Sequence, residues 1–206
     1  LKSYRLSVFD ELPRTGLPEV FDSYNEYERT IDVMVNAGVI EDSTKVWWDL
    51  RPSARFPTLE MRITDICTRI DDTIAIATLY LCLIRMLLRL RSLNQRWRQY
   101  SRFLIMENRW RAQRYGASEG LIDFGRGQIV PFSDLVEELI ELVEQDAIAL
   151  NCLPELLHVR DIVARGTSAD RQLATFKKAQ EDGKSEQEAF IEVVDQLSRE
   201  TLMDCT

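Results

Sequence analysis

The sequence predicts an α+β fold in which helices cover a partial antiparallel sheet. Three observations favour this class: apolar residues recur at helical spacing over much of the chain, two short segments alternate with period two, and a hairpin is indicated around residues 120–130. The 206 residues are 45% hydrophobic with only 8 Gly and 6 Pro, which excludes collagen-like, low-complexity and disordered classes. We find no internal repeat and no linker, so we expect residues 1–206 to form a single domain.

The N-terminal part is predicted to hold a strand, a loop and a helix. Residues 3–9 are short and strand-like, and the prolines and glycine within residues 13–18 indicate a turn or ordered loop. Ser23 and Glu26 have the spacing of a capping box at the start of the helix, and Gly38 is placed to end it.

The next two predicted strands cover residues 45–51 and 58–65, with a loop over residues 52–57 between them. Because side chains alternate between the two faces of a strand, each segment has one apolar face and one polar face. An antiparallel pairing would gather four charged side chains on a single sheet face. These are Asp49, Arg51, Glu60 and Arg62.

Helices are predicted for most of the remaining chain. The first covers residues 71–93, and Arg85 interrupts its apolar run well short of the roughly 20 residues that a membrane span requires, so we expect a buried core helix. The hairpin is expected to turn at residues 125–127. Residues 103–115 are predicted to be a helix or a strand that leads into a helix. Further helices are predicted over residues 133–150, with Ser133 as cap, and 155–164, ending at Gly166. Two final helices start with the capping patterns Thr167–Asp170 and Ser185–Glu188.

Net charge, the single histidine and the cysteine spacing argue against several classes of function. The net charge of -8 argues against a protein that wraps nucleic acid over its whole surface, although residues 85–114 carry nine arginines against Glu107 alone, which leaves a local nucleic-acid site as a minor alternative. The sole histidine, His158, is expected to be structural or superficial. The cysteines fit no zinc or disulfide framework, so we expect reduced, partly buried thiols in a cytoplasmic protein. They are Cys67, Cys82, Cys152 and Cys205.

The charged face of the two-strand unit is the most informative constellation in the chain. The sequence has no phosphate-binding Gly-x-x-x-x-Gly-Lys loop, no Gly-x-Gly-x-x-Gly and no Gly-x-Ser-x-Gly. In a functional interpretation, Glu60 binds a divalent cation while Arg51, Arg55 and Arg62 neutralise phosphoryl oxygens. An ordinary surface ion pair explains the same spacing, and one glutamate is too weak a magnesium site without further carboxylates.

Four segments resemble the bacterial carboxylate-amine ligases of the glutamate-cysteine ligase type. They are residues 47–65, which resemble the family's signature, residues 13–18, 107–116 and 165–172. They follow one another in the family's order across nearly the whole chain. The resemblance implies a glutamine synthetase-like fold, of which this chain would be the helix-rich C-terminal part with a partial antiparallel sheet. It also implies a preceding N-terminal part, absent from these residues, that supplies most magnesium ligands.

The resemblance further implies ATP-dependent ligation of the glutamate γ-carboxylate to an amine, such as that of cysteine, through an acyl phosphate, with ATP and Mg²⁺ as cofactors. Roles follow for the residues that match the motifs. Glu60 would be the metal ligand, Arg62 and Arg114 catalytic, Arg51, Arg55, Asn108 and Arg109 nucleotide-binding, and Arg14 substrate-binding.

The partners that this reading implies are glutamate, the amine acceptor and the N-terminal part of the same enzyme. The chain would supply one wall of the active site and would be inactive alone. A homo-oligomer is left open, whereas neither nucleic acid nor membrane is expected. The alternative is a noncatalytic partner subunit or ligand-binding scaffold derived from such a ligase.

Overall fold

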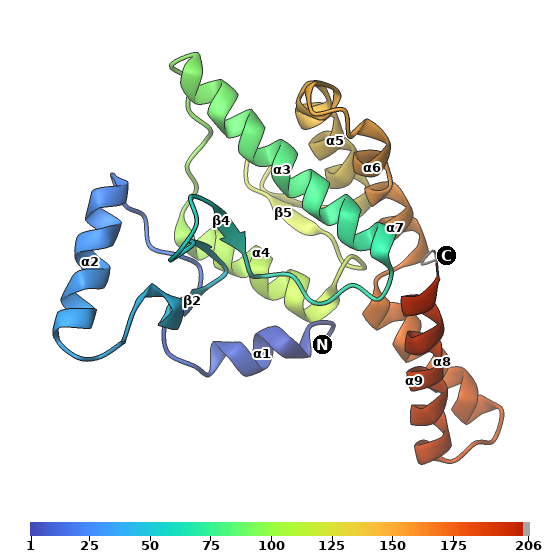
Figure 1. The fold of residues 1–206 in the computed structure, drawn as a ribbon. Coiled ribbons are helices and arrows are strands. Elements are labelled where there is room, and N and C mark those ends of the chain that lie inside the picture. The colour runs from blue at the N-terminus through green and yellow to red at the C-terminus, as the bar shows by residue number, and fades with distance from the viewer. Residues whose placement is uncertain (204–206) are drawn as a thin grey trace. The chain divides into compact units, whose positions relative to one another are not determined.

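The computed structural model describes residues 1–203, and its internal contacts group them into two compact units (Figure 1). Unit 2 is Tyr4–Asp65, and unit 1 joins Leu1–Ser3 to the chain from Ile66 onward. Helices make up most of unit 1 and two further helices lie in unit 2, and three two-stranded sheets accompany them, so the predicted α+β class is confirmed. The predictions of a single domain and of a glutamine synthetase-like fold stay predictions.

Unit 2 contains two helices, a short 3-10 turn and four short strands. In chain order they are α1 (Tyr4–Asp10), β1 (Thr15–Gly16), α2 (Tyr24–Asn36), η1 (Ser43–Lys45), β2 (Trp47–Trp48), β3 (Leu50–Pro52) and β4 (Leu59–Met61). A small core packs beneath α2, and its buried members are Tyr27, Ile31, Ile40 and Val46. This core supports the short strands that carry the predicted site.

The strand predicted over residues 3–9 is wrong, because these residues form the helix α1. Leu6 is the buried residue of this helix, and the Arg5 guanidinium lies 4.7 Å from the centroid of the Phe9 ring, four residues further along. Contacts between residues four apart form on a helix and not on a strand, where such side chains are too distant. The apolar residues within 3–9 are too few to distinguish the period of two of a strand from the period of 3.6 of a helix.

The helix predicted after Ser23 is confirmed as α2, although its capping differs in one respect. The Ser23 side chain accepts a hydrogen bond from the backbone N–H of Glu26 at 3.2 Å. The Glu26 carboxylate accepts from the backbone N–H of Asp22 at 2.7 Å, one residue before the position that a capping box requires. Gly38, at φ +70°, follows the end of the helix as predicted.

The single strand predicted over residues 45–51 is divided in the structure. β2 pairs in parallel with β1, whereas β3 pairs antiparallel with β4 and places Arg51 opposite Glu60. Asp49 lies between β2 and β3, where the chain changes its partner strand from β1 to β4. Its backbone N–H donates to Gly16 O at 2.8 Å, and its carbonyl accepts from Arg62 N–H at 2.7 Å. The predicted antiparallel pair is thus confirmed, but Asp49 and Arg51 are buried rather than on a free face.

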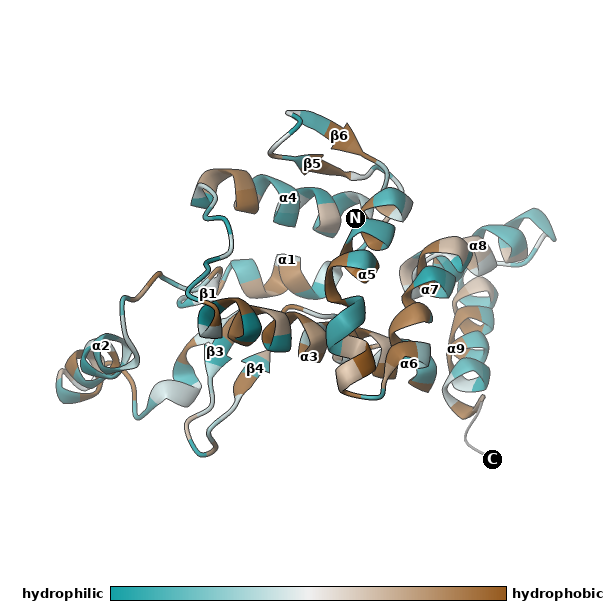
Figure 2. Cartoon of the chain, turned by 90° about the horizontal axis from the view of Figure 1, so that it is seen from above, coloured by the Kyte–Doolittle hydropathy of each residue, from teal (hydrophilic) through white to brown (hydrophobic). Residues whose placement is uncertain are grey.

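Unit 1 is built on one long helix, α3 (Ile70–Ser92), which packs against α5, α6 and α7. The other elements are α4 (Arg102–Tyr115), β5 (Leu121–Asp123), β6 (Gln128–Val130), α5 (Phe132–Ala149), α6 (Leu153–Leu157), α7 (Val159–Arg165), α8 (Ser168–Glu181) and α9 (Glu186–Leu202). Figure 2 shows apolar residues on α3, α5 and α6. The fully buried centre consists of Ala75, Cys82, Val143, Ala147 and Leu156.

The predicted core helix is confirmed for one face of α3 only. Ala75, Cys82 and Met86 are buried on this face, while Leu81 and Leu88 are 50% and 63% exposed. Over the described residues, α3 is also long and apolar enough to cross a membrane by length and composition. One such helix is weak evidence, because core helices of soluble proteins pass the same test, and the absence of a membrane partner stays a prediction.

Two helix boundaries of unit 1 differ from the predictions. The helix predicted over residues 155–164 is two helices, α6 and α7, which meet at His158. Pro131 rather than Ser133 is the N-cap of α5, because the proline has an extended backbone and Ser133 already lies in the first turn. The hairpin of β5 and β6 and the capping boxes of α8 and α9 are confirmed.

The cysteines within residues 1–203 are free thiols, as predicted. Cys82 is fully buried, with its Sγ 3.9 Å from that of Cys152, and burial in the first place raises the pKa of Cys82 to about 12. Cys205 lies outside the described residues. The Cys82 thiol is therefore protonated at neutral pH and is not a nucleophile.

Candidate functional site

The centre of the candidate site is the ion pair between Arg51 on β3 and Glu60 on β4. Nε and Nη2 of Arg51 both lie 3.0 Å from Glu60 Oε2, because the antiparallel register places the two residues opposite each other. Arg51 is 7% exposed, whereas the Glu60 side chain is 34% exposed. The structure thus brings a half-exposed carboxylate against a buried guanidinium.

The third guanidinium nitrogen of Arg51, Nη1, is directed at the protein backbone instead of Glu60. It donates to the carbonyl oxygens of Ser43 at 3.0 Å, Thr44 at 2.8 Å and Val46 at 2.7 Å. Val46 is 1% exposed and belongs to the core of unit 2. Arg51 consequently joins the η1 turn and the core to the carboxylate of Glu60.

Arg62 lies beside the same carboxylate but is more accessible. Its Nη1 is 3.6 Å from Glu60 Oε2, and its side chain is 29% exposed. Its backbone is fixed by the bond from its N–H to Asp49 O and by Arg5 Nη2, which donates to its carbonyl at 2.9 Å. Arg62 can therefore turn toward an anion at the exposed side of Glu60 without breaking a short ion pair.

The carboxylate of Glu60 could contribute one ligand to a metal ion. Arg51 and Arg62 both approach Glu60 at Oε2, and neither arginine donates a hydrogen bond to Oε1. Within residues 1–203, no three histidine, cysteine, aspartate or glutamate side chains come together in a metal-binding group. The chain therefore fits a divalent cation as the source of one oxygen ligand and not as a complete site.

Arg55 and Arg14 take different positions in unit 2. Arg55 is exposed on the loop between β3 and β4, where its backbone N–H lies 3.4 Å from Ser53 Oγ and its guanidinium is available to solvent. Arg14, at φ +62°, donates from Nε to Lys45 O at 3.0 Å and lies 5.8 Å from the centroid of the Trp47 ring. Arg14 thus holds the same η1 segment as Arg51, and the predicted substrate role stays a prediction.

The three remaining predicted site residues lie on α4, in unit 1. The Asn108 amide pairs with the backbone of Ile122 on β5, donating to its carbonyl at 2.9 Å and accepting from its N–H at 2.8 Å. Arg109 is buried at 7% exposure, whereas Arg114 is exposed near the end of the helix, 5.9 Å from the centroid of the Tyr115 ring. Asn108 therefore attaches the β5–β6 hairpin to α4.

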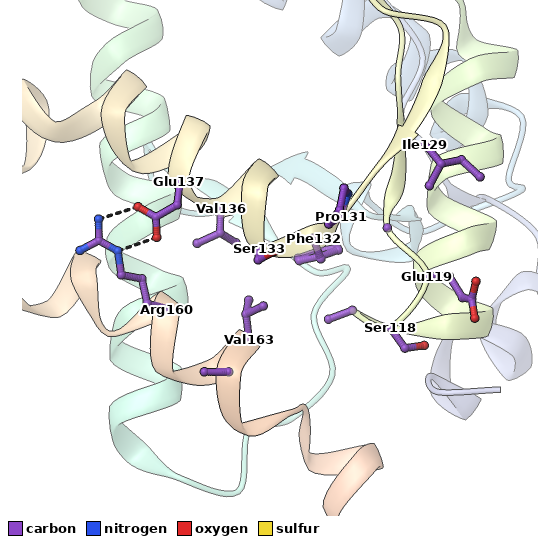
Figure 3. Close-up of a pocket in the computed structure, with 13 residues that line it drawn as sticks. Ser118, Glu119, Ile129, Pro131, Phe132, Ser133, Val136, Glu137, Arg160 and Val163 are labelled. Carbon is purple, nitrogen blue, oxygen red and sulfur yellow. Dashed lines mark hydrogen bonds and ion pairs between the residues drawn. The ribbon is translucent and has the colours of Figure 1, made fainter.

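Each unit has a pocket, and no predicted site residue lines either of them. The pocket of unit 1 has a volume of about 680 Å³ and lies between the start of α5, α7 and the β5–β6 hairpin (Figure 3). At its edge Arg160 forms a two-pronged ion pair with Glu137, at 2.7 and 2.6 Å. The pocket of unit 2, of about 570 Å³, adjoins Ser53 and Ala54 of the loop that carries Arg55.

Sequence reasoning missed a buried ion-pair cluster at the start of α3. Asp72 accepts two hydrogen bonds from Arg165 Nη2, at 2.6 and 2.7 Å, and its Oδ1 lies 3.0 Å from His158 Nε2. Burial alone would raise the pKa of Asp72, but the bonds from Arg165 and His158 hold it below the usual value. Spacing could not reveal this cluster, because Asp72 and Arg165 are 93 positions apart.

A second missed cluster joins α8 and α9. Arg171 donates from Nε and Nη2 to the two carboxylate oxygens of Glu200, at 2.9 and 2.8 Å, and Thr68 Oγ1 also donates to this carboxylate. Both clusters use residues 165–172, the segment that resembles a family motif without a predicted role. These contacts give residues 165–172 a structural role, because they connect α3, α7, α8 and α9.

Comparisons with known proteins agree with these motifs. The model of the family described as "Glutamate-cysteine ligase family 2" matches residues 1–195. A protein of Rhodospirillum rubrum named "Putative glutamate--cysteine ligase 2" is 59% identical over 202 residues, which are 98% of this chain and 52% of that protein. Proteins of the same name from Jannaschia sp. and Paracoccus denitrificans are 57% and 48% identical over 204 residues, which are 99% of this chain and 54% of each protein.

Proposed function

This chain belongs to the glutamate-cysteine ligase family 2, and from that membership we propose that it supplies one wall of the active site of an ATP-dependent ligase. The proposed reaction joins the γ-carboxylate of glutamate to an amine, such as that of cysteine, in the cytoplasm. The chain spans about half the length of the curated relatives it matches, so the other wall would come from the remaining family sequence. The observation that carries the proposal is Glu60, held between Arg51 and Arg62 within the matched family region.

The proposed chemistry has two steps. A γ-carboxylate oxygen attacks the terminal phosphorus of ATP, and ADP leaves, which gives an acyl phosphate. The amine nitrogen then attacks the acyl carbon, phosphate leaves with the electrons of the broken bond, and the nitrogen loses a proton. Both steps place negative charge on phosphoryl oxygens, and enzymes accelerate such transfers mainly by positioning and by electrostatic stabilisation.

The accessible charged residues of unit 2 suit this task. Glu60 Oε1 would provide one oxygen ligand to Mg²⁺, which when bound neutralises phosphate charge. Arg62, partly exposed beside Glu60, would stabilise the transferred phosphoryl group, and Arg55, exposed on its loop, would bind nucleotide phosphates. The resemblance also assigns phosphate to Arg51, but this residue is buried and bound to Glu60 and to backbone carbonyl oxygens, so the proposed phosphate contacts here are those of Arg55 and Arg62.

The residues of unit 1 and Arg14 have less direct support. Arg114 is exposed and carries a guanidinium that could reach an anionic ligand, which is compatible with a catalytic role. Asn108 and Arg109 would act on the nucleotide, although the Asn108 amide already bonds the backbone of Ile122. Arg14 would bind glutamate. These four assignments rest on the family resemblance.

The proposal is tested by measuring ADP release from a polypeptide of the relatives' length that contains this chain. With ATP, Mg²⁺, glutamate and a panel of amines, ADP release should require both glutamate and an amine. Glu60→Ala and Arg62→Ala should abolish release in proteins that remain folded at the assay temperature, as circular dichroism would verify. Arg160→Ala, which removes an exposed ion pair with Glu137 within unit 1, is the matched control and should retain activity.

Undiminished turnover in both site variants would refute the assignment. The 206-residue chain by itself should release no ADP. Binding of glutamate or nucleotide without ADP release, in the chain and in the longer polypeptide alike, would favour the noncatalytic subunit or scaffold instead.

A further inference from the structure

We propose that Arg51 is a positioning residue that fixes the carboxylate of Glu60, and that it does not contact the nucleotide. The inference rests on the proposed function, in which Glu60 supplies an oxygen ligand and arginines of the same motif bind phosphate. Arg51 and Arg55, which are both predicted from the sequence to bind nucleotide, would then have different roles.

The first argument is that the Nε and Nη1 donors of Arg51 already form hydrogen bonds and that its Nη2 forms an ion pair. A guanidinium has five N–H groups and no acceptor. Nε and Nη2 are directed at Glu60 Oε2, and Nη1 is shared among the carbonyl oxygens of Ser43, Thr44 and Val46. Binding a phosphate through Nη1 would break these bonds and remove the Arg51 donor from the buried carbonyl oxygen of Val46, which is unfavourable for a guanidinium whose residue is 7% exposed.

The second argument is that the contact fixes which oxygen of Glu60 is free. Both donors of Arg51 converge on Oε2, which lies 3.0 Å from each, and Arg62 Nη1 approaches the same atom at 3.6 Å. Rotation of the carboxylate would break the hydrogen bond from Nε and the ion pair with Nη2 at once. Oε1 is therefore held on the side of the carboxylate away from the buried guanidinium.

The third argument is that Arg51 connects this orientation to the core. Its three carbonyl partners belong to η1 and to Val46, which is 1% exposed and packs with Tyr27 and Ile31. A lysine could reach Glu60 or the carbonyl oxygens but not both, because its ammonium group is a single point of charge. The planar guanidinium is thus required for the connection, and not only its charge.

Arg55 provides the contrast within the same motif. It lies on the loop between β3 and β4, is exposed, and presents its guanidinium to solvent. An arginine in this state can bind phosphate without losing an existing buried bond. We therefore assign nucleotide contact in this unit to Arg55 and positioning to Arg51.

The first test uses nuclear magnetic resonance of the 206-residue chain with ¹⁵N-labelled arginine. The Nε–H signal of Arg51, identified by its loss in Arg51→Lys, should exchange slowly with water and should shift strongly in Glu60→Gln. Addition of ATP without metal should leave it unchanged. A shift with ATP, or a signal that is indifferent to Glu60→Gln, would overturn the proposal.

The second test separates the two roles by kinetics in the polypeptide of the relatives' length. Loss of a residue that orients a metal ligand typically weakens metal binding 10-fold to 100-fold. Arg51→Lys should therefore raise the half-saturating Mg²⁺ concentration at least about 10-fold, with little change in the KM for ATP at saturating Mg²⁺. Arg55→Gln should do the reverse, and Arg29→Lys, at an exposed arginine of α2, should change neither.

The remaining outcomes also decide the question. A higher KM for ATP in Arg51→Lys at saturating Mg²⁺, without altered Mg²⁺ dependence, would show that Arg51 binds nucleotide. A lower unfolding temperature with both constants unchanged would show a purely structural role. If no polypeptide releases ADP, the proposed function fails, while the resonance of Arg51 still reports whether it holds Glu60.

Discussion

The ion pair between Arg171 and Glu200 gives the sharpest prediction about stability. The contact is bidentate, the two side chains are 15% and 12% exposed, and Gln196 Nε2 donates to the same carboxylate at 2.9 Å. The hydrogen bonds from Arg171, in the first place, lower the pKa of Glu200 to about 2 from a usual value of 4.5. The folded state therefore favours the ionised carboxylate far more than the unfolded state does.

The size of this effect follows from linkage between protonation and folding. The pKa difference between 4.5 and about 2 corresponds to about 3 kcal/mol, at about 1.4 kcal/mol per pKa unit. Because the folded pKa is the lower one, this stabilisation is present above the unfolded pKa. It is lost as the pH falls from about 4.5 towards about 2.

Arg171→Met should therefore lower the free energy of unfolding by about 3 kcal/mol at pH 7, because it leaves a largely buried carboxylate without its partner. Urea denaturation followed by circular dichroism at pH 7, 5, 4 and 3 measures the difference from the unmodified chain. The difference should shrink steadily below pH 4.5. Arg160→Met, which breaks the ion pair with Glu137 at side chains 46% and 48% exposed, should cost less than about 1 kcal/mol.

Two results would refute the reasoning. One is a difference between the parent and Arg171→Met that stays constant from pH 7 to pH 3, since the linkage would then be absent. The other is an equal loss of stability in Arg171→Met and Arg160→Met, since burial of the pair would then not matter. Hydrogen exchange of α8 and α9 adds a local measurement, because these helices carry the two partners.

Three further predictions concern the core and hairpin of unit 1. Gly120→Ala should lower the free energy of unfolding by several kcal/mol, roughly the cost of a severe steric clash plus a strained backbone. The added Cβ would overlap the carbonyl oxygen of Val130, and φ at this position is +68°. Gly127→Ala, where φ is +66° but the surrounding space is open, should cost only about 1 kcal/mol in thermal unfolding. Cys82, whose pKa burial raises to about 12, should resist iodoacetamide at pH 8 in the folded chain and react in urea; rapid labelling when folded would contradict its burial. Asp146→Asn should cost about 3 kcal/mol in urea denaturation, because this buried carboxylate pairs with two arginines of α3; a loss below about 1 kcal/mol would contradict that pairing.

Local signals in the sequence predicted the elements that depend on neighbouring residues. The capping boxes of α8 and α9 occur where Thr167 and Ser185 indicate them, because a cap is formed by residues only three positions apart. The hairpin turn at residues 125–127 and the pairing of Arg51 with Glu60 likewise follow from short-range patterns. These features need no knowledge of distant contacts.

Features that depend on distant contacts were not predictable in this way. The strand over residues 45–51 divides at Asp49 because its backbone N–H and carbonyl bond to Gly16 and Arg62, which lie on different segments. The helices α6 and α7 meet at His158, whose ring reaches Asp72 on α3. In both places, hydrogen bonds to residues distant in the sequence coincide with the end of the strand or helix, and local propensity does not predict such bonds.

The candidate site illustrates the same limit for function. Arginines of this chain look equivalent in the sequence, yet several are bound to carboxylates that are themselves partly or fully buried. These pairs are Arg51 with Glu60, Arg89 with Asp146, Arg165 with Asp72, and Arg171 with Glu200. An arginine held in this way stabilises the fold and is not free to bind an anion, since leaving its partner would strand a desolvated charge.

Accessibility therefore separates ligand-binding arginines from structural ones better than motif position does. By this criterion Arg55 and Arg114, which are exposed, are the arginines most accessible to an anionic ligand, and Arg62 is intermediate because its contact with Glu60 is 3.6 Å long. Arg51 lies in the same matched region, but it is buried and its guanidinium is bound to Glu60 and to backbone carbonyl oxygens. The surplus of arginine in the sequence thus overstates the positive charge available to a substrate.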